Sequence, residues 1–266
     1  YAYGAHEQQL DAVRDKAASF LGCATEELVL TTCTSEGLNR VAQGLNLAAG
    51  DHVLTTDQEH PGGRACWDYV VRTRGVVLDV VAISPGEHDA AAIVERMTKA
   101  ITPRTKVMSV SHLLSSTGLR MPIASLCAAA RAHDVISVVD GAQAVGGIAV
   151  DVKALGCDAY ATSGHKWLLA PCGQGVFYVR KEHQDKLRPI ALGWNNVRCP
   201  NYVAQDELAY HSGARRFEAG THNSVGLVGL KAAMDLLADV GVDNIAAELL
   251  RKRAWFVPEL QNKGWT

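Results

Sequence analysis

The chain has 266 residues, of which 48% are hydrophobic, enough for one large core or for one core and part of a second domain. Its 26 Lys and Arg residues against 28 Asp and Glu residues give a formal net charge of −2, and no block of like charges occurs, so the sequence predicts no binding of nucleic acid. No apolar stretch is long enough to span a bilayer, and we therefore expect no membrane partner.

The seven cysteines are odd in number and scattered, without the paired spacing of a metal site. We therefore expect reduced thiols, a cytoplasmic location and no bound metal. The sequence shows no signal peptide, but it opens without Met and stops directly after a helical pattern, so we interpret it as a fragment.

Short apolar runs, typical of buried strands, alternate along the chain with amphipathic stretches, typical of helices. The strand predictions, in chain order, are Leu28–Thr32, His52–Thr56, Val76–Ile83, Lys106–Ser111, Val135–Asp140, Ala159–Thr162 and Gly175–Val179. The helix predictions are Glu7–Leu21, Glu36–Leu45, Gly63–Arg74, Ala90–Ala100, Ile123–His133 and Val152–Leu155. Apolar strands separated by helices indicate a three-layer α/β/α fold with a mostly parallel sheet.

The last part of the chain has a different character. Gly193–Ala214 is polar, aromatic and irregular, with Trp194, Tyr202 and Tyr210, which indicates a loop excursion near the sheet. Asn223–Leu250 is rich in Ala and Leu, and its pattern is helical again. In open parallel sheets, ligands bind outside the carboxyl ends of the strands, so the residues that follow each predicted strand are the candidates for a site.

Four predicted strands end in polar residues that suit one kind of cofactor. Lys166 follows a strand, and an amine held there can bond to an aldehyde. Asp140 ends another strand, and a buried carboxylate can keep a pyridine nitrogen protonated. Thr34 and Ser35 open a helix, whose N-terminus attracts phosphate. His60 follows a fourth strand and could stack on a ring and move protons.

Each of these residues also has a plain structural interpretation. Asp140 could cap the next helix, and Thr34 with Ser35 could form an ordinary helix N-cap. His60, before a proline, could be a turn residue, and Lys166 could be a solvated surface lysine. The order and spacing of the four features together favour the cofactor site.

Two runs resemble the class V aminotransferase family of pyridoxal-phosphate (PLP) enzymes: V-V-D-G-A-Q-A-V-G (Val138–Gly146) and D-A-Y-A-T-S-G-H-K-W (Asp158–Trp167). That family includes cysteine desulfurases, selenocysteine lyases and isopenicillin N epimerase-like enzymes. Further segments that resemble it extend the similarity over nearly the whole chain: T-T-D-Q-E-H-P (Thr55–Pro61), P-C-G-Q-G-V-F-Y-V-R (Pro171–Arg180) and R-F-E-A-G-T (Arg216–Thr221).

The resemblance implies a fold and a division of the chain. Residues 1–222 are expected to form the PLP-binding large domain of a fold-type I enzyme, with an N-terminal segment missing. Residues 223–266 are expected to form a helix that leads into a truncated C-terminal small domain.

The resemblance also implies roles around PLP. Lys166 forms the aldimine with the cofactor and later moves a proton, while Asp140 pairs with the pyridine nitrogen. Gln143 hydrogen-bonds the phenolic oxygen of the ring, and His60 stacks on its face.

The phosphate of PLP is expected to be bound by four residues of the same chain, namely Thr34, Ser35, Ser163 and His165. Thr221 is similar to a residue that, in this family, reaches the phosphate of the partner subunit. A homodimer is therefore implied.

Two positions depart from the family or need interpretation. Ser115 stands where relatives commonly have Asn, and a hydroxyl lacks the reach of an amide. Cys172 follows the cofactor lysine closely, but we interpret it as a small residue packed in a tight turn before Gly173. The resemblance implies that the persulfide-forming cysteine and the carboxylate-binding arginine of desulfurases are to be expected in a C-terminal part that this sequence does not contain.

The resemblance implies an enzyme with an amino-acid substrate. The first hypothesis is a C–S lyase of the cysteine desulfurase or selenocysteine lyase type, favoured by the D-G-A-Q and E-H-P runs. The alternative is an isopenicillin N epimerase-like racemase or an aminotransferase, with which T-D-Q-E-H-P-G-G and Trp67 agree. A binding protein without activity is the third reading, and Lys166 and Asp140 argue against it because such a protein needs neither.

Overall fold

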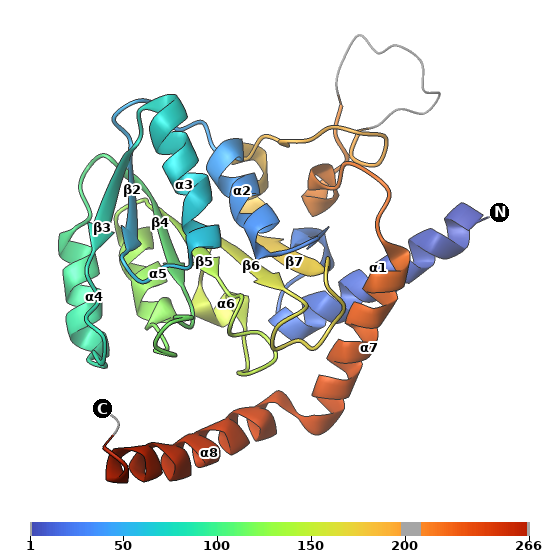
Figure 1. The fold of residues 1–266 in the computed structure, drawn as a ribbon. Helices are drawn as coiled ribbons and strands as arrows, with labels where there is room; N and C mark the ends of the chain where they lie inside the picture. Colours follow the sequence, from blue (N-terminus) through green and yellow to red (C-terminus); the bar gives the residue numbers. More distant parts are fainter. Residues whose placement is uncertain (1, 198–208, 265–266) are drawn as a thin grey trace.

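A computed structural model describes residues 2–197 and 209–264 of the chain. A seven-stranded sheet lies at its centre (Figure 1). The strands are β1 (Leu28–Thr31), β2 (His52–Thr56), β3 (Val77–Val81), β4 (Thr105–Ser111), β5 (Ile136–Asp140), β6 (Ala159–Ser163) and β7 (Gly175–Val179). Their order across the sheet is β1-β7-β6-β5-β4-β2-β3.

Most strands run in the same direction, so their carboxyl ends lie at the same edge of the sheet. β7 runs antiparallel to both of its neighbours, β1 and β6, whereas the pairings among β2, β3, β4, β5 and β6 are parallel. Every strand except β7 therefore points the same way, and the carboxyl ends of these six meet at one edge. The predicted mostly parallel sheet is confirmed, and all seven predicted strands are present with ends shifted by at most two residues.

Helices cover both faces of the sheet, so the predicted three-layer architecture is also confirmed (Figure 1). One face carries α2 (Thr34–Gly44) and α3 (Pro61–Arg74). The other face carries α1 (Ala2–Leu21), α4 (Ala90–Lys99), α5 (Ile123–Ala132), α6 (Val152–Leu155) and α7 (Ser224–Val240). Three short 3-10 helices, Thr25–Glu27, Lys181–Lys186 and Gly213–Phe217, lie in the connections.

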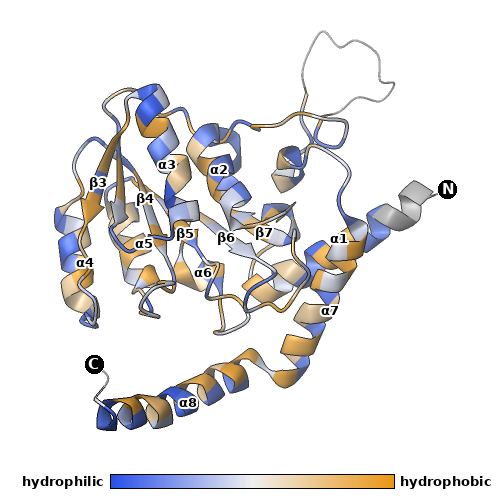
Figure 2. Cartoon of the chain, in the orientation of Figure 1, coloured by the Kyte–Doolittle hydropathy of each residue, from blue (hydrophilic) through white to orange (hydrophobic). Residues whose placement is uncertain are grey.

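The alternation of side chains along each strand divides the core into two clusters. In β6, Tyr160 packs with residues of α1, α5 and α7, whereas Ala159 and Ala161 pack with α2 and α3 on the opposite face. The same division separates Val138 from Val139 in β5. Because successive strand side chains point to opposite faces, a strand buried on both sides carries apolar residues on both. Figure 2 shows hydrophobic colouring in β3 and paler colouring in β6, whose buried residues include Thr162 and Ser163.

The C-terminal part differs from the prediction. The predicted helical pattern Asn223–Leu250 is helical in the structure, but as two helices: α7 ends at Val240 and α8 (Val242–Asn262) begins after Gly241, whose φ of 85° no helix accepts. α8 contains no buried residue among those described, and Figure 1 shows it running from the end of α7 back below the sheet and its helices, toward the side of α4.

The predicted loop excursion Gly193–Ala214 lies in part outside the described residues, and Tyr202 is among those not covered. In the described flanks, Val197 forms an isolated bridge with Tyr210, and a 3-10 helix begins at Gly213.

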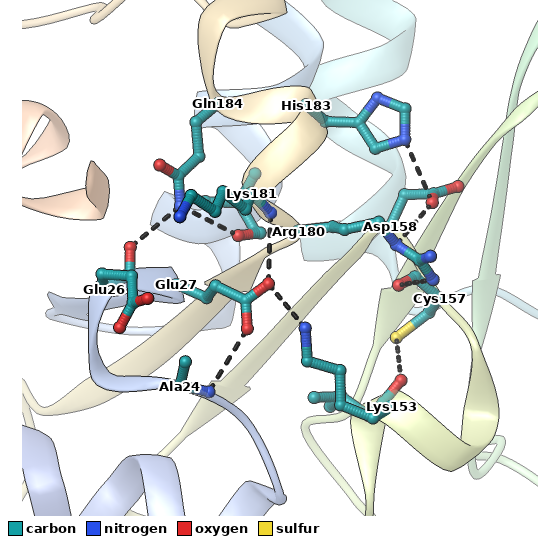
Figure 3. Close-up of polar contacts among 12 residues, drawn as sticks. Ala24, Glu26, Glu27, Lys153, Cys157, Asp158, Arg180, Lys181, His183 and Gln184 are labelled. Atoms are coloured by element: carbon teal, nitrogen blue, oxygen red, sulfur yellow. Dashed lines mark hydrogen bonds and ion pairs between the residues drawn. The ribbon is translucent and has the colours of Figure 1, made fainter. Parts of the chain in front are cut away.

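The amino end of β6 is closed by a polar cluster shown in Figure 3. Glu27 accepts a hydrogen bond from the Lys153 ammonium at 2.6 Å, and Asp158 pairs with Arg180 and His183, each at 3.1 Å. Burial by itself raises the pKa of Asp158, but the hydrogen bonds from His183 and Ser137 outweigh it, so the pKa is lowered. Asp158 precedes β6 and Arg180 follows the antiparallel β7, so this cluster lies at the edge opposite the carboxyl ends.

In the parts of the chain that the structure describes, no helix has the length and apolar character needed to cross a bilayer. Over the same residues, no group of three or more His, Cys, Asp or Glu side chains is arranged to bind a metal ion. The six cysteines described are all free.

Candidate active site

Asp140 is the last residue of β5 and lies buried at the carboxyl edge of the sheet. Its Oδ1 accepts a hydrogen bond from the Ala142 amide at 2.9 Å, the geometry expected of a residue that caps a turn. The described residues donate no hydrogen bond to Oδ2. That oxygen faces Gly63 at the start of α3, where an added Cβ would lie only 2.9 Å away. Glycine at 63 therefore keeps one side of a buried carboxyl open.

Two more of the predicted site residues act electrostatically on Asp140. Burial raises the pKa of Asp140, while the Ala142 N–H and the positive charges of Lys166 and His60 act to lower it. Burial wins, and the pKa is raised. Lys166 and His60 are thus close enough to influence the carboxyl, although the three residues come from different loops.

Lys166 lies in a tight loop between β6 and β7. The Gly164 amide donates to the Gln174 carbonyl at 2.7 Å, and the Ala170 amide donates back to the Gly164 carbonyl at 2.9 Å. Leu169, with φ of 57°, closes the turn by donating its amide to the Lys166 carbonyl. The Lys166 side chain is half-buried and makes no hydrogen bond or ion pair with the described residues. The loop is fixed by its backbone, and within the described residues no other side chain holds the amine.

Two hydroxyls meet where α2 begins. The Thr34 amide donates to Ser163 Oγ at 2.9 Å, and the two hydroxyl oxygens lie 2.8 Å apart. Ser35 Oγ donates to the Gly62 carbonyl at 3.3 Å, which joins the first turns of α2 and α3. Hydroxyls at the N-terminus of an eleven-residue helix form a favourable environment for an anion.

His60 serves as the N-cap of α3. Its Nδ1 accepts a hydrogen bond from the Gly62 amide at 3.0 Å, and Pro61 occupies the first turn. His60 is therefore a helix N-cap and not the turn residue of its plain structural interpretation. The side chain is exposed and sits beside Asp140, so the same residue is also available to a ligand.

Gln143 connects the loop after β5 to the lysine loop. Its Oε1 accepts a hydrogen bond from the Trp167 indole N–H at 3.1 Å. Gly146 allows this contact, because its φ is 98° and an added Cβ would lie 2.3 Å from the Trp167 carbonyl oxygen.

Two predicted residues are not hydrogen-bonded to this group within the described part of the chain. His165 and Thr221 are exposed, and in the described part of the chain no hydrogen bond joins either of them to the other predicted site residues. Thr221 lines a small pocket with Arg14, Glu218 and His222. The site residues of one chain thus gather without Thr221.

Sequence reasoning missed Glu59, which lies between the ends of β2 and β4. Ser111 Oγ donates to its Oε2 at 2.6 Å, and Thr56 Oγ1 donates to its Oε1 at 2.7 Å. Burial raises the pKa of Glu59, the two hydroxyls oppose that effect, and the negative charge of Asp140 adds to it. The signal was present, because Glu59 directly precedes His60 in T-T-D-Q-E-H-P.

Sequence reasoning also missed a buried ion pair near Thr221. Glu218 accepts from both terminal nitrogens of Arg14, from the Leu30 amide at 2.8 Å and from His222 at 2.9 Å. Burial alone would raise the pKa of Glu218, but His222 and Arg14 lower it to about 2. R-F-E-A-G-T contains Glu218, whereas nothing in the sequence marks Arg14, 204 positions away, as its partner.

Cys172 and Ser115, the two positions that depart from the family or need interpretation, lie at the surface. Cys172 occupies a turn before Gly173 as predicted, but it is exposed, so the prediction that it is packed is wrong. Gly173 has φ of 77° and open space around it, which explains why the turn projects outward. Ser115 is exposed as well, and it is its neighbour Ser116 that donates to Gln58 Oε1, at 3.3 Å.

A sheet of this topology with a lysine, an aspartate and paired hydroxyls at its carboxyl edge defines a class of cofactor-dependent enzymes. Residues 3–265 match the model of the aminotransferase class-V family, and the chain belongs to that family. The chain is 36% identical to an isopenicillin N epimerase of Amycolatopsis lactamdurans over 95% of its own length and 64% of that protein's. Cysteine desulfurases are also among its homologues.

Solved structures share the fold. The apo cysteine desulfurase of Thermococcus onnurineus NA1 is 30% identical, with a TM-score of 0.87 over 97% of this chain and 64% of that one. A lysine-to-alanine mutant of C-DES, with glycine covalently linked to its PLP cofactor, is 29% identical, with a TM-score of 0.84 over 92% of this chain and 64% of that one. The chain thus spans less than two thirds of the length of these relatives.

Proposed function

We propose that this protein binds PLP through Lys166 and acts on an amino acid. The observation that supports this most strongly is the state of Asp140: a buried carboxyl with one oxygen bonded by the protein, the other open toward Gly63, and the charges of Lys166 and His60 beside it. A buried carboxyl left open in this way suits a cationic ring nitrogen. The family uses this cofactor, and a structural neighbour contains it.

The side chains present suit each end of the cofactor. Lys166 would hold the aldehyde end through its amine and move a proton at the substrate, and Asp140 would bind the pyridine nitrogen. Gln143 would donate to the phenolic oxygen, and His60 would cover the ring face. Bound PLP withdraws electrons from the substrate's α-carbon.

The phosphate end would be held where α2 begins. Thr34, Ser35 and Ser163 surround the first turn of that helix, and its dipole favours a dianion. His165 completes the set that we assign to the phosphate.

The reaction we favour is C–S bond cleavage of the cysteine desulfurase or selenocysteine lyase type. Support comes from the fold shared with a cysteine desulfurase and with the cystine C–S lyase C-DES. Racemisation of the isopenicillin N epimerase type is the second candidate, and the 36% identity with such an epimerase favours it. Transfer of the amino group, as in an aminotransferase, is the third candidate reaction.

The assembly we propose is a homodimer in the cytoplasm. Thr221 is exposed and apart from the site of its own chain, as expected of a residue that reaches the partner's PLP phosphate. The division into a large domain (1–222) and the beginning of a small domain (223–266) is part of the same proposal.

The cofactor is tested by absorbance. The purified protein incubated with PLP and freed of excess should keep a band in the near ultraviolet or visible range that borohydride bleaches. Lys166→Ala should lose it, whereas Lys99→Ala, which removes an exposed lysine of α4, should retain it. A wild-type protein that stays colourless after PLP addition would refute the proposal.

The reaction is tested with a panel of amino acids in the presence of a thiol that reduces persulfide to sulfide. Stoichiometric sulfide and alanine from cysteine would support the desulfurase. D-isomer without net loss of substrate would select the epimerase, and a keto acid would select the aminotransferase.

A further inference from the structure

Glu59 is a carboxyl held between two strand ends. Its two oxygens accept hydrogen bonds from different strands, Oε2 from Ser111 of β4 at 2.6 Å and Oε1 from Thr56 of β2 at 2.7 Å. Both donors are themselves buried. The side chain therefore has one orientation at the carboxyl edge of the sheet, and the chain on either side of it is fixed there.

The turn that Glu59 anchors is the one that carries His60. His60 is the next residue and caps α3 through its Nδ1. Asp57, two residues before Glu59, accepts a hydrogen bond from the Ile83 amide at 2.9 Å, so the turn is fixed at its start as well. The position of the His60 ring thus depends on the contacts of Glu59.

The charges around Glu59 are unbalanced. Asp140 is the charged group that acts on it across the site, and it has the same sign. The positive charges of Lys166 and His60 act on Asp140, and no cation of the described residues forms an ion pair with Glu59. The two carboxyls therefore influence each other at this edge of the sheet, and within the described residues Glu59 has no cation as an ion-pair partner.

We propose that Glu59 is a positioning residue of the cofactor site, which fixes the turn that presents His60 and adds a second negative charge behind Asp140. The proposal rests on the proposed PLP site and assigns a role to a residue outside the group that would touch the cofactor. A negative charge held in a region of low dielectric favours the protonated, cationic forms of a bound ring and of its link to Lys166. Glu59 thereby raises the proton affinity of the bound cofactor.

The test replaces Glu59 with its neutral isostere. Glu59→Gln keeps the length of the side chain and can still bond both hydroxyls, because its amide accepts from one and donates to the other. With PLP bound, the pH midpoint of the cofactor's absorbance change should move to lower pH by about one unit relative to wild type. The dissociation constant of PLP should change far less.

Glu87→Gln is the matched control. Glu87 is likewise partly buried and bonded, to Arg96 and to the Ser84 amide, but it follows the outermost strand β3 and neither partner is a residue of the proposed site. Its absorbance titration should coincide with that of the wild-type protein.

Titrations of Glu59→Gln and wild type that coincide, or a midpoint that moves upward, would overturn the proposal. If Glu59→Gln does not fold, Ser111→Ala replaces it. Removal of that hydroxyl makes the Glu59 carboxyl harder to ionise, so the midpoint should move in the same direction by a smaller amount, and no movement overturns the proposal. A wild-type protein that takes up no PLP would instead refute the proposed function.

Discussion

The hydroxyl oxygens of Thr34 and Ser163 lie 2.8 Å apart, although 129 residues separate them along the chain. Thr34 begins α2 after β1, and Ser163 ends β6 two strands away in the sheet. Their contact is possible because β1 and β6 point the same way, with the antiparallel β7 between them. It joins the helix N-terminus to the loop of Lys166.

This contact leads to a prediction for the affinity of PLP. In Ser163→Ala the Thr34 amide and hydroxyl lose their partner, so the phosphate end of the site should loosen and the dissociation constant of PLP should rise roughly ten- to a hundredfold. A fluorescence or absorbance titration of the apoprotein measures this. Ser125→Ala, an exposed position on α5, is the control that should bind PLP like wild type.

Asp140 gives a prediction in which binding and turnover separate. Asp140→Asn retains the size of the side chain and an oxygen for the Ala142 amide, but it cannot stabilise a positive ring nitrogen. The variant should keep the PLP absorbance and lose turnover by a factor on the order of 10²–10⁴. Steady-state kinetics on the substrate found in the amino-acid panel, beside Asp68→Asn as a surface control, measures the loss. Turnover within a factor of two of wild type would contradict the assigned role.

Gly141 follows Asp140 directly and allows a prediction for stability. An added Cβ would lie 2.0 Å from Cε1 of Tyr160, a fully buried ring whose hydroxyl also bonds His112 at 3.0 Å. The ring cannot retreat, so Gly141→Ala should lower the free energy of unfolding by about 2 kcal/mol or more. Gly220→Ala is the matched control, since nothing lies within 4 Å of its added Cβ. Urea denaturation of both variants decides the point.

Glu218 gives a prediction for the dependence of stability on pH. Its pKa falls from an ordinary 4.5 to about 2 in the folded protein, because the charges and hydrogen bonds of His222 and Arg14 outweigh the cost of burial. A carboxyl whose pKa is lower in the folded than in the unfolded protein stabilises the folded state at pH values above its unfolded pKa. This contribution is lost as the pH falls from about 4.5 toward 2. The shift corresponds to a contribution on the order of 3 kcal/mol at neutral pH.

The measurement compares the free energies of unfolding of wild type and Glu218→Gln across that range. The difference should be large at pH 7 and should shrink as the pH approaches 2. Glu248→Gln on α8 should show no such difference, because its bonds to Arg251 are exposed and screened by solvent. A gap between wild type and Glu218→Gln that is independent of pH would show that the lost packing, and not the charge, causes it.

Much of the fold could be read from the sequence, because it depends on local pattern. The run Val135–Asp140 has apolar residues at both odd and even positions, which is typical of a strand covered on both faces. The helix break at Gly241 was missed, because apolar periodicity continues across it and a single glycine within a helical pattern is tolerated often enough to be ambiguous.

The sequence by itself determined the residue types of the candidate site, since Lys166, Asp140, Thr34 and His60 each lie at or after the end of a strand, and the ends of parallel strands meet at one edge of the sheet. Only the tertiary structure decided which of them meet. The pairing of Thr34 with Ser163, of Ser111 with Glu59 and of Arg14 with Glu218 joins segments 129, 52 and 204 residues apart. Contacts of that range depend on strand order and on packing between layers, which local pattern does not carry.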